Sequence, residues 1–411
     1  MPVSLEQTSQ SPAMKPEPRK IGILIALITI LNMVAPLSTD MYLAALPTMT
    51  DVFDTTEGLL NMTLVGFFFF FAIGMLLFGP LSDKFGRKPV LIVGLIAYGG
   101  FSIACALSVN IGMLIASRIL QALGAGCMIA VSTAIIKDSF QGKRRNSILA
   151  IVQTMSVLAP MLAPVIGAFI VQYASWRETF WVLVVIAVIC IIAASIIDEA
   201  LPRAARRTGS VWSAFRGLSD VVKNRAFLFF LLIMATASMS FMAYIATSSY
   251  IYIDYFGLTE TQFSFYFAIN SAILMLGPMT FVRVVKRFAA KPLITVCIAV
   301  PLASGILVLL FGQLSPVLFL ICFIPFSFIS SLSRPLATSI LLSQHDGDAG
   351  ASSSVINFGN TLFGAIGMVL GSLPWSNFII GLGTLLTVCP LIALIGWIIF
   401  LNKGYTLRET N

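Results

Sequence analysis

Long apolar stretches recur along the chain and are separated by short polar segments. A stretch of about 20 apolar residues can cross the roughly 30 Å hydrocarbon core of a bilayer as a helix. The sequence predicts twelve such helices, at residues 22–47, 57–79, 89–108, 110–137, 145–171, 178–198, 226–253, 261–282, 291–312, 315–343, 349–372 and 376–401. Membrane β-barrels instead alternate polar and apolar residues along short strands. We therefore expect an all-α membrane protein.

The longest polar segment between these helices runs from Asp198 to Arg225 and divides them into two sets of six. The two sets share a short sequence repeat: Gly79-Pro80 lies at the end of the second predicted helix, and Gly277-Pro278 lies near the end of the eighth. Two related six-helix bundles around a central cavity are the usual plan of an alternating-access transporter. We expect a tail, a bundle, a linker, a bundle and a tail, at residues 1–20, 21–198, 199–224, 225–402 and 403–411.

Composition agrees with this pattern. Of the 411 residues, 58% are hydrophobic and 10% are charged, whereas soluble domains have about 25% charged residues. The mean hydropathy of +0.97 also excludes a disordered chain. The six cysteines lie in apolar stretches without a CxxC spacing, and His345 has no second ligand nearby, so we expect neither disulfides nor a metal site.

The net charge of +8 does not indicate nucleic acid once the charges are placed along the chain. All lysines and arginines except Arg118, Arg177 and Arg334 lie in the tails or in the even-numbered connections. The positive-inside rule therefore places both termini in the cytoplasm. The basic surplus orients the protein and attracts the bilayer surface.

Three charged residues lie well inside predicted membrane helices, away from the helix ends: Asp40, Arg118 and Arg334. Such charges are costly, and each is a functional hypothesis by default. Asp40 and Arg118 lie at similar depth, roughly 10 to 12 Å from the outer surface. We expect the desolvated Asp40 to bind and release a proton, with Arg118 modulating it by its positive charge. A static ion pair is the alternative, although apolar replacements of such pairs are often no less stable.

The segment from Gly79 to Pro89, GPLSDKFGRKP, resembles the loop between helices 2 and 3 of the major facilitator superfamily. Its glycines, Gly79 and Gly86, permit tight turns, and its basic residues, Arg87 and Lys88, can bind acids. In that family the acidic residue, here Asp83, caps the start of helix 11 and pairs through the arginine with an acid at the end of helix 4, here Asp138. The resemblance thus implies a cytoplasmic gate. Positive-inside topology explains the basic residues equally well, but not the Gly, Pro and Asp spacing.

Two further motifs resemble the drug:proton antiporter branch of that family. The fourth predicted helix has Arg118 and Gln121 one turn apart, and the fifth has Pro160, Pro164 and Gly167 in APMLAPVIGA. Two prolines four residues apart bend a helix and free carbonyl groups, and small residues permit close packing. A kinked packing helix without any bearing on the direction of transport is the alternative.

The first predicted helix contains APLSTDMYLAALP, residues 35–47, which resembles the Bcr/CflA-type exporters of bicyclomycin and chloramphenicol. The resemblance implies a monomer in the bacterial inner membrane that exports small antimicrobials and needs no cofactor beyond the proton gradient. Its partners would be the substrate, protons and lipid. We expect substrate contacts from polar or aromatic positions: Asn32, Met41, Tyr42, Gln121, Tyr244, Asn270, Arg334 and Asn357.

Arg334 departs from that subfamily, where a neutral polar residue precedes the corresponding proline. If it faces the cavity, it favours an anionic or zwitterionic ligand. Otherwise it contacts backbone carbonyls at the Pro335 kink. Both interpretations remain open.

Other function classes fit less well. A carrier of one physiological solute, such as a metabolite, peptide or metal chelate, could use the same fold. An enzyme would need a nucleophile with a base, a metal set or a nucleotide loop, and the sequence offers none of these. A receptor would not need an intramembrane carboxylate. We therefore expect a transporter and no catalysis.

Overall fold

The computed structural model describes residues 18–203, 206, 221–285, 287–344 and 349–403. Within these ranges the chain is helical and contains no strand. The helices are α1 (Pro18–Leu43), α2 (Leu46–Val52), α3 (Glu57–Phe85), α4 (Arg87–Ala106), α5 (Ile111–Ser139), α6 (Gly142–Tyr173), α7 (Trp176–Ile196), α9 (Arg225–Ser249) with its π-helical extension η2 (Tyr250–Tyr255), α10 (Glu260–Val284), α11 (Ala290–Phe311), α12 (Pro316–Ser343), α13 (Ala349–Gly371) and α14 (Phe378–Asn402).

Twelve of the described helices have 20 or more residues, and each corresponds to one predicted span. Eleven of them are long and apolar enough to cross a membrane. The remaining one, α6, contributes the shorter apolar segment Leu158–Tyr173. The predicted all-α membrane fold is therefore confirmed.

Several predicted helix ends were wrong, and prolines or glycines explain them. α1 ends at Leu43 rather than at residue 47, because the Pro47 ring would clash with the Leu43 carbonyl. α3 continues through Pro80 and ends at Gly86, whose φ of +103° suits glycine. α10 contains Pro278, as the predicted range 261–282 requires, and ends two residues later than predicted, at Val284.

Only part of the expected tails and linker lies within the described residues. Residues 18–20, expected in the tail, form the first turn of α1, where a proline suits the first helical position. Residues 1–17, 204–205, 207–220 and 404–411 lie outside the described ranges. The boundaries of the two bundles stay predictions.

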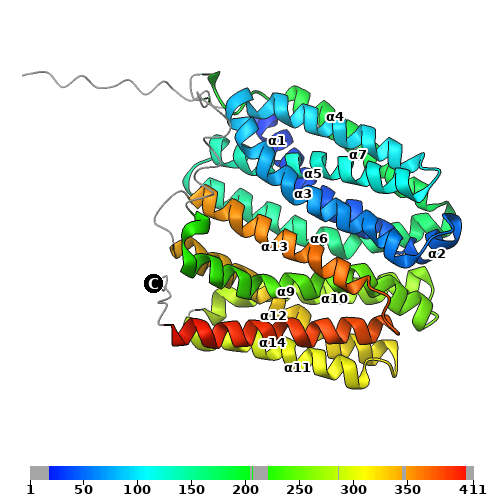
Figure 1. The fold of residues 1–411 in the computed structure, drawn as a ribbon. Helices are drawn as coiled ribbons and strands as arrows, with labels where there is room; N and C mark the ends of the chain where they lie inside the picture. The colour runs from blue at the N-terminus through cyan, green and yellow to red at the C-terminus, as the bar shows by residue number, and fades with distance from the viewer. Residues whose placement is uncertain (1–17, 204–205, 207–220, 286, 345–348, 404–411) are drawn as a thin grey trace, which may run out of the picture.

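The long helices pack as two groups that lie side by side (Figure 1). α1 and α3–α7 form the upper group in this view, and α9–α14 form the lower group. Between the groups, α3 packs against α13 and α6 packs against α10. α1 begins and α14 ends on the same side of the molecule (Figure 1). We call this side the basic end, because it carries Lys84, Arg87, Lys88, Arg203 and Arg206, and the opposite side the α2 end.

The two groups repeat one close helix contact. Gly167 of α6 lies against the backbone of Met41 in α1, and Gly367 of α13 lies against the backbone of Met239 in α9. A Cβ atom at either glycine would overlap the facing backbone. Small residues of this kind let membrane helices approach closely. The repeated contact agrees with two pseudo-symmetric halves.

The buried apolar residues form two clusters that differ in what they join. The larger cluster combines the first bundle with the α2-end part of the second, including Tyr250, Phe323 and Leu386. The smaller cluster lies at the basic end and contains second-bundle residues alone, among them Phe230 and Trp397. The bundles therefore share a core at the α2 end and have separate cores at the basic end.

Candidate functional site

Asp40 lies near the α2 end of α1 and is buried, with 5% of its surface exposed. The hydroxyl of Thr39 donates a hydrogen bond of 2.8 Å to its Oδ1 atom. Among the described residues, no basic side chain lies within 4.0 Å of the carboxyl group. The carboxyl group is therefore withdrawn from water without a neutralising cation.

Arg118 of α5 is fully buried inside the first bundle. Its Nη1 atom donates to the Ser38 carbonyl oxygen at 3.0 Å and to Gln121 Oε1 at 2.7 Å. The guanidinium carbon lies 4.2 Å from the ring centroid of Phe67 and 5.4 Å from that of Tyr42, which are cation–π distances. Its Nε and Nη2 atoms have no hydrogen-bond partner within the described ranges.

The structure brings Asp40 and Arg118 to the same part of α1 without joining them in an ion pair. Arg118 meets the α1 face that carries Ser38 and Tyr42, which are one turn apart. Asp40 is two residues from each of them and so points to roughly the opposite side of α1. A static ion pair between these residues is absent from the described structure. Any influence of Arg118 on Asp40 would act across the helix.

Two residues expected to contact substrate lie in the interior of the first bundle. The Tyr42 hydroxyl hydrogen-bonds to Thr63 of α3. Gln121 accepts from Arg118 and donates to Ser102 of α4 at 2.7 Å. These contacts give both side chains partners within the bundle. Their contact with substrate stays a prediction.

The other expected substrate residues differ in exposure. Arg334 and Asn357 are exposed, and Asn32 is half-buried and donates to Ser132 of α5 at 3.1 Å. The rest are buried: Met41, Tyr244 and Asn270. Met41 supplies the α1 backbone against which Gly167 packs. The two second-bundle residues, Tyr244 and Asn270, lie close to α12 and are considered again below.

The proline pair in α6 makes a contact between the bundles. In a helix the carbonyl of Pro160 would accept from the backbone N–H of residue 164, but Pro164 has none. The freed carbonyl oxygen instead accepts a hydrogen bond of 3.3 Å from Ser271 of α10. The prolines therefore do more than bend α6, because they expose an acceptor to the other bundle.

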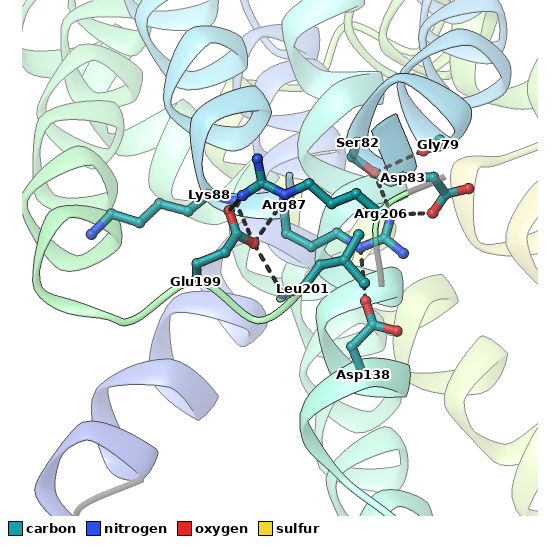
Figure 2. A network of polar contacts seen from close by, with 9 residues as sticks. All are labelled: Gly79, Ser82, Asp83, Arg87, Lys88, Asp138, Glu199, Leu201 and Arg206. Atoms are coloured by element: carbon teal, nitrogen blue, oxygen red, sulfur yellow. Dashed lines mark hydrogen bonds and ion pairs between the residues drawn. The ribbon is translucent and has the colours of Figure 1, made fainter. Parts of the chain in front are cut away.

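At the basic end, Arg87 joins three helix ends (Figure 2). Its guanidinium is 2.5 Å from Asp83 of α3 and 2.8 Å from Asp138 of α5, and it donates to Ser82 at 2.6 Å. Gly86 makes the turn between α3 and α4 that places Arg87 first in α4. The motif residues that the sequence links are thus in direct contact.

Gly79 differs from its expected place in a turn, because it lies inside α3. Its carbonyl accepts from the Ser82 hydroxyl at 2.8 Å. A contact between Asp83 and the start of α13 stays a prediction, since residues 345–348 and the first side chains of α13 lie outside the described part of the chain.

Glu199, which follows α7, was not among the residues predicted from the sequence. Its Oε1 atom accepts from the backbone N–H groups of Arg87 at 2.9 Å and Leu201 at 3.1 Å (Figure 2). Its Oε2 atom is 3.4 Å from Arg206. A carboxylate at a helix N-terminus is favourable because of the free N–H groups and the helix dipole. Glu199 thus caps α4.

Lys88 contacts the C-terminal end of α7, as Glu199 contacts the N-terminal end of α4. Its ammonium group donates to the carbonyl oxygens of Ser195 at 2.7 Å and Ile197 at 2.8 Å, at the end of α7. Cations are favoured at helix C-termini. Lys88 and Glu199 therefore tie α4 and α7 together by opposite charges at opposite helix ends.

The comparisons with known proteins agree with this geometry. Residues 28–368 match the Major Facilitator Superfamily. The chain belongs to this family. It is 27% identical to the multidrug resistance protein MdtL of Escherichia coli O81 over 90% of this chain and 93% of MdtL. It is also 27% identical to the bicyclomycin resistance protein homolog of Haemophilus influenzae, over 85% and 88% of the two chains.

These relatives confirm the resemblance to the Bcr/CflA-type exporters. The fold is also that of a solved bacterial homolog of the human lysosomal transporter Spinster, in an inward-facing and occupied conformation. The TM-score is 0.75 at 14% identity, and the match covers 96% of this chain and all of the other. The protein is therefore a multi-pass transporter of the major facilitator superfamily.

Proposed function

We propose that this transporter exports small antimicrobial compounds across a bacterial inner membrane in exchange for protons. The observation that carries the proposal is Asp40, a carboxyl group 5% exposed in a membrane-spanning helix and without a basic partner among the described residues. An unpaired carboxylate in such a place is costly, and binding a proton removes that cost. Asp40 can therefore alternate between a charged and a neutral form.

The proposed cycle couples this change to substrate. Protonation of Asp40 and occupancy by substrate alternate, so that inward proton movement drives outward substrate movement. The names of the relatives in Escherichia coli and Haemophilus influenzae support drug export as the direction. The lysines and arginines of the basic end support a cytoplasmic location for that end.

The test is proton movement in proteoliposomes that contain a pH-sensitive dye. Chloramphenicol, bicyclomycin, ethidium and 2-naphthoate are added in turn to wild type and to Asp40→Asn. Asp51→Asn is the matched control, because Asp51 is an exposed carboxyl group on α2. We expect compound-triggered proton movement in wild type and in the control, but not in Asp40→Asn.

Two results would contradict the proposal. Uphill transport that survives in Asp40→Asn would remove this carboxyl group from the coupling. No proton movement with any compound in wild type would favour a carrier of one physiological solute.

A further inference from the structure

Arg334 is a charged residue in the membrane-spanning helix α12, roughly 13 Å from its basic end. Among the described residues, its guanidinium has no carboxylate within 4.0 Å. The described contact of this group is with the ring of Phe241 in α9, whose centroid is 5.9 Å from the guanidinium carbon. A guanidinium in a membrane helix normally pairs with an anion, because an unpaired one is costly.

Within its described residues, the second bundle offers no carboxylate near this group. Residues 261–344 and 349–402 contain no aspartate or glutamate. The carboxyl groups of the described second bundle belong to Asp254 and Glu260, which lie at the α2 end. A counter-ion for Arg334 must therefore come from another part of the protein or from a ligand.

Arg334 points away from the lipid-facing side of α12. That side carries exposed apolar residues, including Leu318 and Ile321. At about 100° per residue, Arg334 lies roughly 160° and 220° around the helix from these two positions. Arg334 is nevertheless exposed, at the level where the bundles have separate cores. Its guanidinium is therefore accessible from between the bundles.

Other hydrogen-bond donors lie on the same face of α12. Ser327, Ser330 and Arg334 follow the i, i+3, i+7 spacing of one helix face. The Ser330 hydroxyl is buried and has no hydrogen-bond partner among the residues that the structure describes. Ser327 donates at 2.6 Å to Oδ1 of Asn270 in α10, whose Nδ2 atom is buried and has no partner in the described part of the chain.

Tyr244 of α9 adds another donor to this face. Its ring stacks on Phe323, one turn before Ser327 in α12, with centroids 4.1 Å apart. Its hydroxyl is buried, and the described residues provide no partner for it. A buried donor without a partner loses its hydrogen bonds to water and gains none, so a cluster of such donors indicates a missing acceptor. We call Arg334, Ser330, Asn270 and Tyr244 the donor strip.

We propose that the donor strip binds substrate and selects small apolar compounds that carry a carboxylate. The guanidinium of Arg334 forms two parallel hydrogen bonds with the carboxylate, as its planar fork permits. The neutral donors of the strip bind oxygen atoms further along the ligand, and the half-buried ring of Phe241 contacts its apolar part. The inference rests on the proposed transport function, and it names the chemical class of the substrate.

The test uses two aromatic probes that differ in charge, 2-naphthoate and its neutral amide, 2-naphthamide. Their affinities for the full-length protein in detergent are measured by calorimetry. We expect 2-naphthoate to bind wild type at least tenfold more tightly than 2-naphthamide. Arg334→Gln should abolish this difference, and Arg334→Lys should keep part of it. Arg283→Gln, which removes an exposed arginine at the end of α10, should leave the difference intact.

A second measurement keeps the test independent of the ligand. Because Arg334→Gln removes an unpaired charge, it should raise the melting temperature of the protein without added probe, whereas Arg283→Gln should not. Equal binding of the two probes to wild type, no binding of either, or an unchanged preference in Arg334→Gln would overturn the proposal. A melting temperature that falls in Arg334→Gln would also overturn it, because Arg334 would then be paired within the protein.

These outcomes are separate from those of the proton experiment. If Asp40→Asn keeps coupled transport while the carboxylate preference holds, the proposed proton coupling fails and the donor strip stands. If proton movement depends on Asp40 but the two probes bind alike, the donor-strip proposal fails and the proposed proton coupling stands.

Discussion

Replacing Glu199 tests how the basic end of the first bundle is held together. Its carboxylate accepts from two backbone N–H groups, those of Arg87 at 2.9 Å and Leu201 at 3.1 Å. A hydrogen bond to a charged group contributes about 1.5–3 kcal/mol, and a helix cap about 0.5–2 kcal/mol. The side chain is 24% exposed, so water replaces part of these contacts in the variant. We expect Glu199→Ala to lower the free energy of unfolding by about 2 kcal/mol.

The assay is unfolding in detergent followed by the fluorescence of Trp176 and Trp181, which lie in α7. Glu199→Gln keeps the accepting oxygen but loses the charge, so we expect it to fall between Glu199→Ala and wild type. Asp198→Ala is the matched control, because its ion pair with Lys20 joins side chains that are 63% and 36% exposed. Such pairs contribute about 0–1 kcal/mol. A Glu199→Ala variant as stable as Asp198→Ala would refute the capping argument.

Two further variants test helix contacts. Gly167→Ala places a methyl group against the α1 backbone, and overpacking of this kind costs about 1–3 kcal/mol, so we expect a lower melting temperature and reduced transport. Ser271→Ala removes the hydrogen bond to the Pro160 carbonyl, worth about 0.5–1.5 kcal/mol, and should increase the population with separated α2 ends about two- to tenfold. Spin labels at the exposed residues Leu107 and Leu314, one on each bundle, measure that separation.

Both variants have controls. Gly100→Ala adds the same methyl group to α4 where nothing lies within 4 Å, and it should match wild type. Equal loss of stability in Gly100→Ala and Gly167→Ala would show that helix flexibility, not the α1 contact, is responsible. An unchanged distance distribution in Ser271→Ala would remove this hydrogen bond from the contacts that join the bundles.

The helices were predictable because each apolar stretch had to be long enough to cross a bilayer. The ends of the helices were less predictable, because a proline can either end a helix or lie inside it. Pro47 begins α2 after a break, whereas Pro80 and Pro278 lie inside helices. The difference depends on neighbouring backbone groups that hydropathy does not report.

The candidate site was also predictable from the sequence only in part. The contact of Arg87 with Asp83 and Asp138 was expected because a family motif links those residues. The role of Glu199 was not, because its partner in α4 is the backbone N–H group of Arg87, 112 positions away, and a backbone group leaves no side-chain signal in the sequence. Nor does helical spacing alone show that Tyr42 turns into the first bundle, because that depends on which neighbour each face of α1 meets.

The hydrogen bond between Ser271 and the Pro160 carbonyl links separation of the bundles to the entry of water. Within α6 this carbonyl lacks its α-helical partner, since residue 164 has no N–H group. When Ser271 leaves it, the oxygen must find another donor, because backbone acceptors are costly to leave unbonded away from water. Parting of α6 and α10 therefore requires hydration at this point. A water molecule arriving at Pro160 would mark the moment at which the bundles separate there.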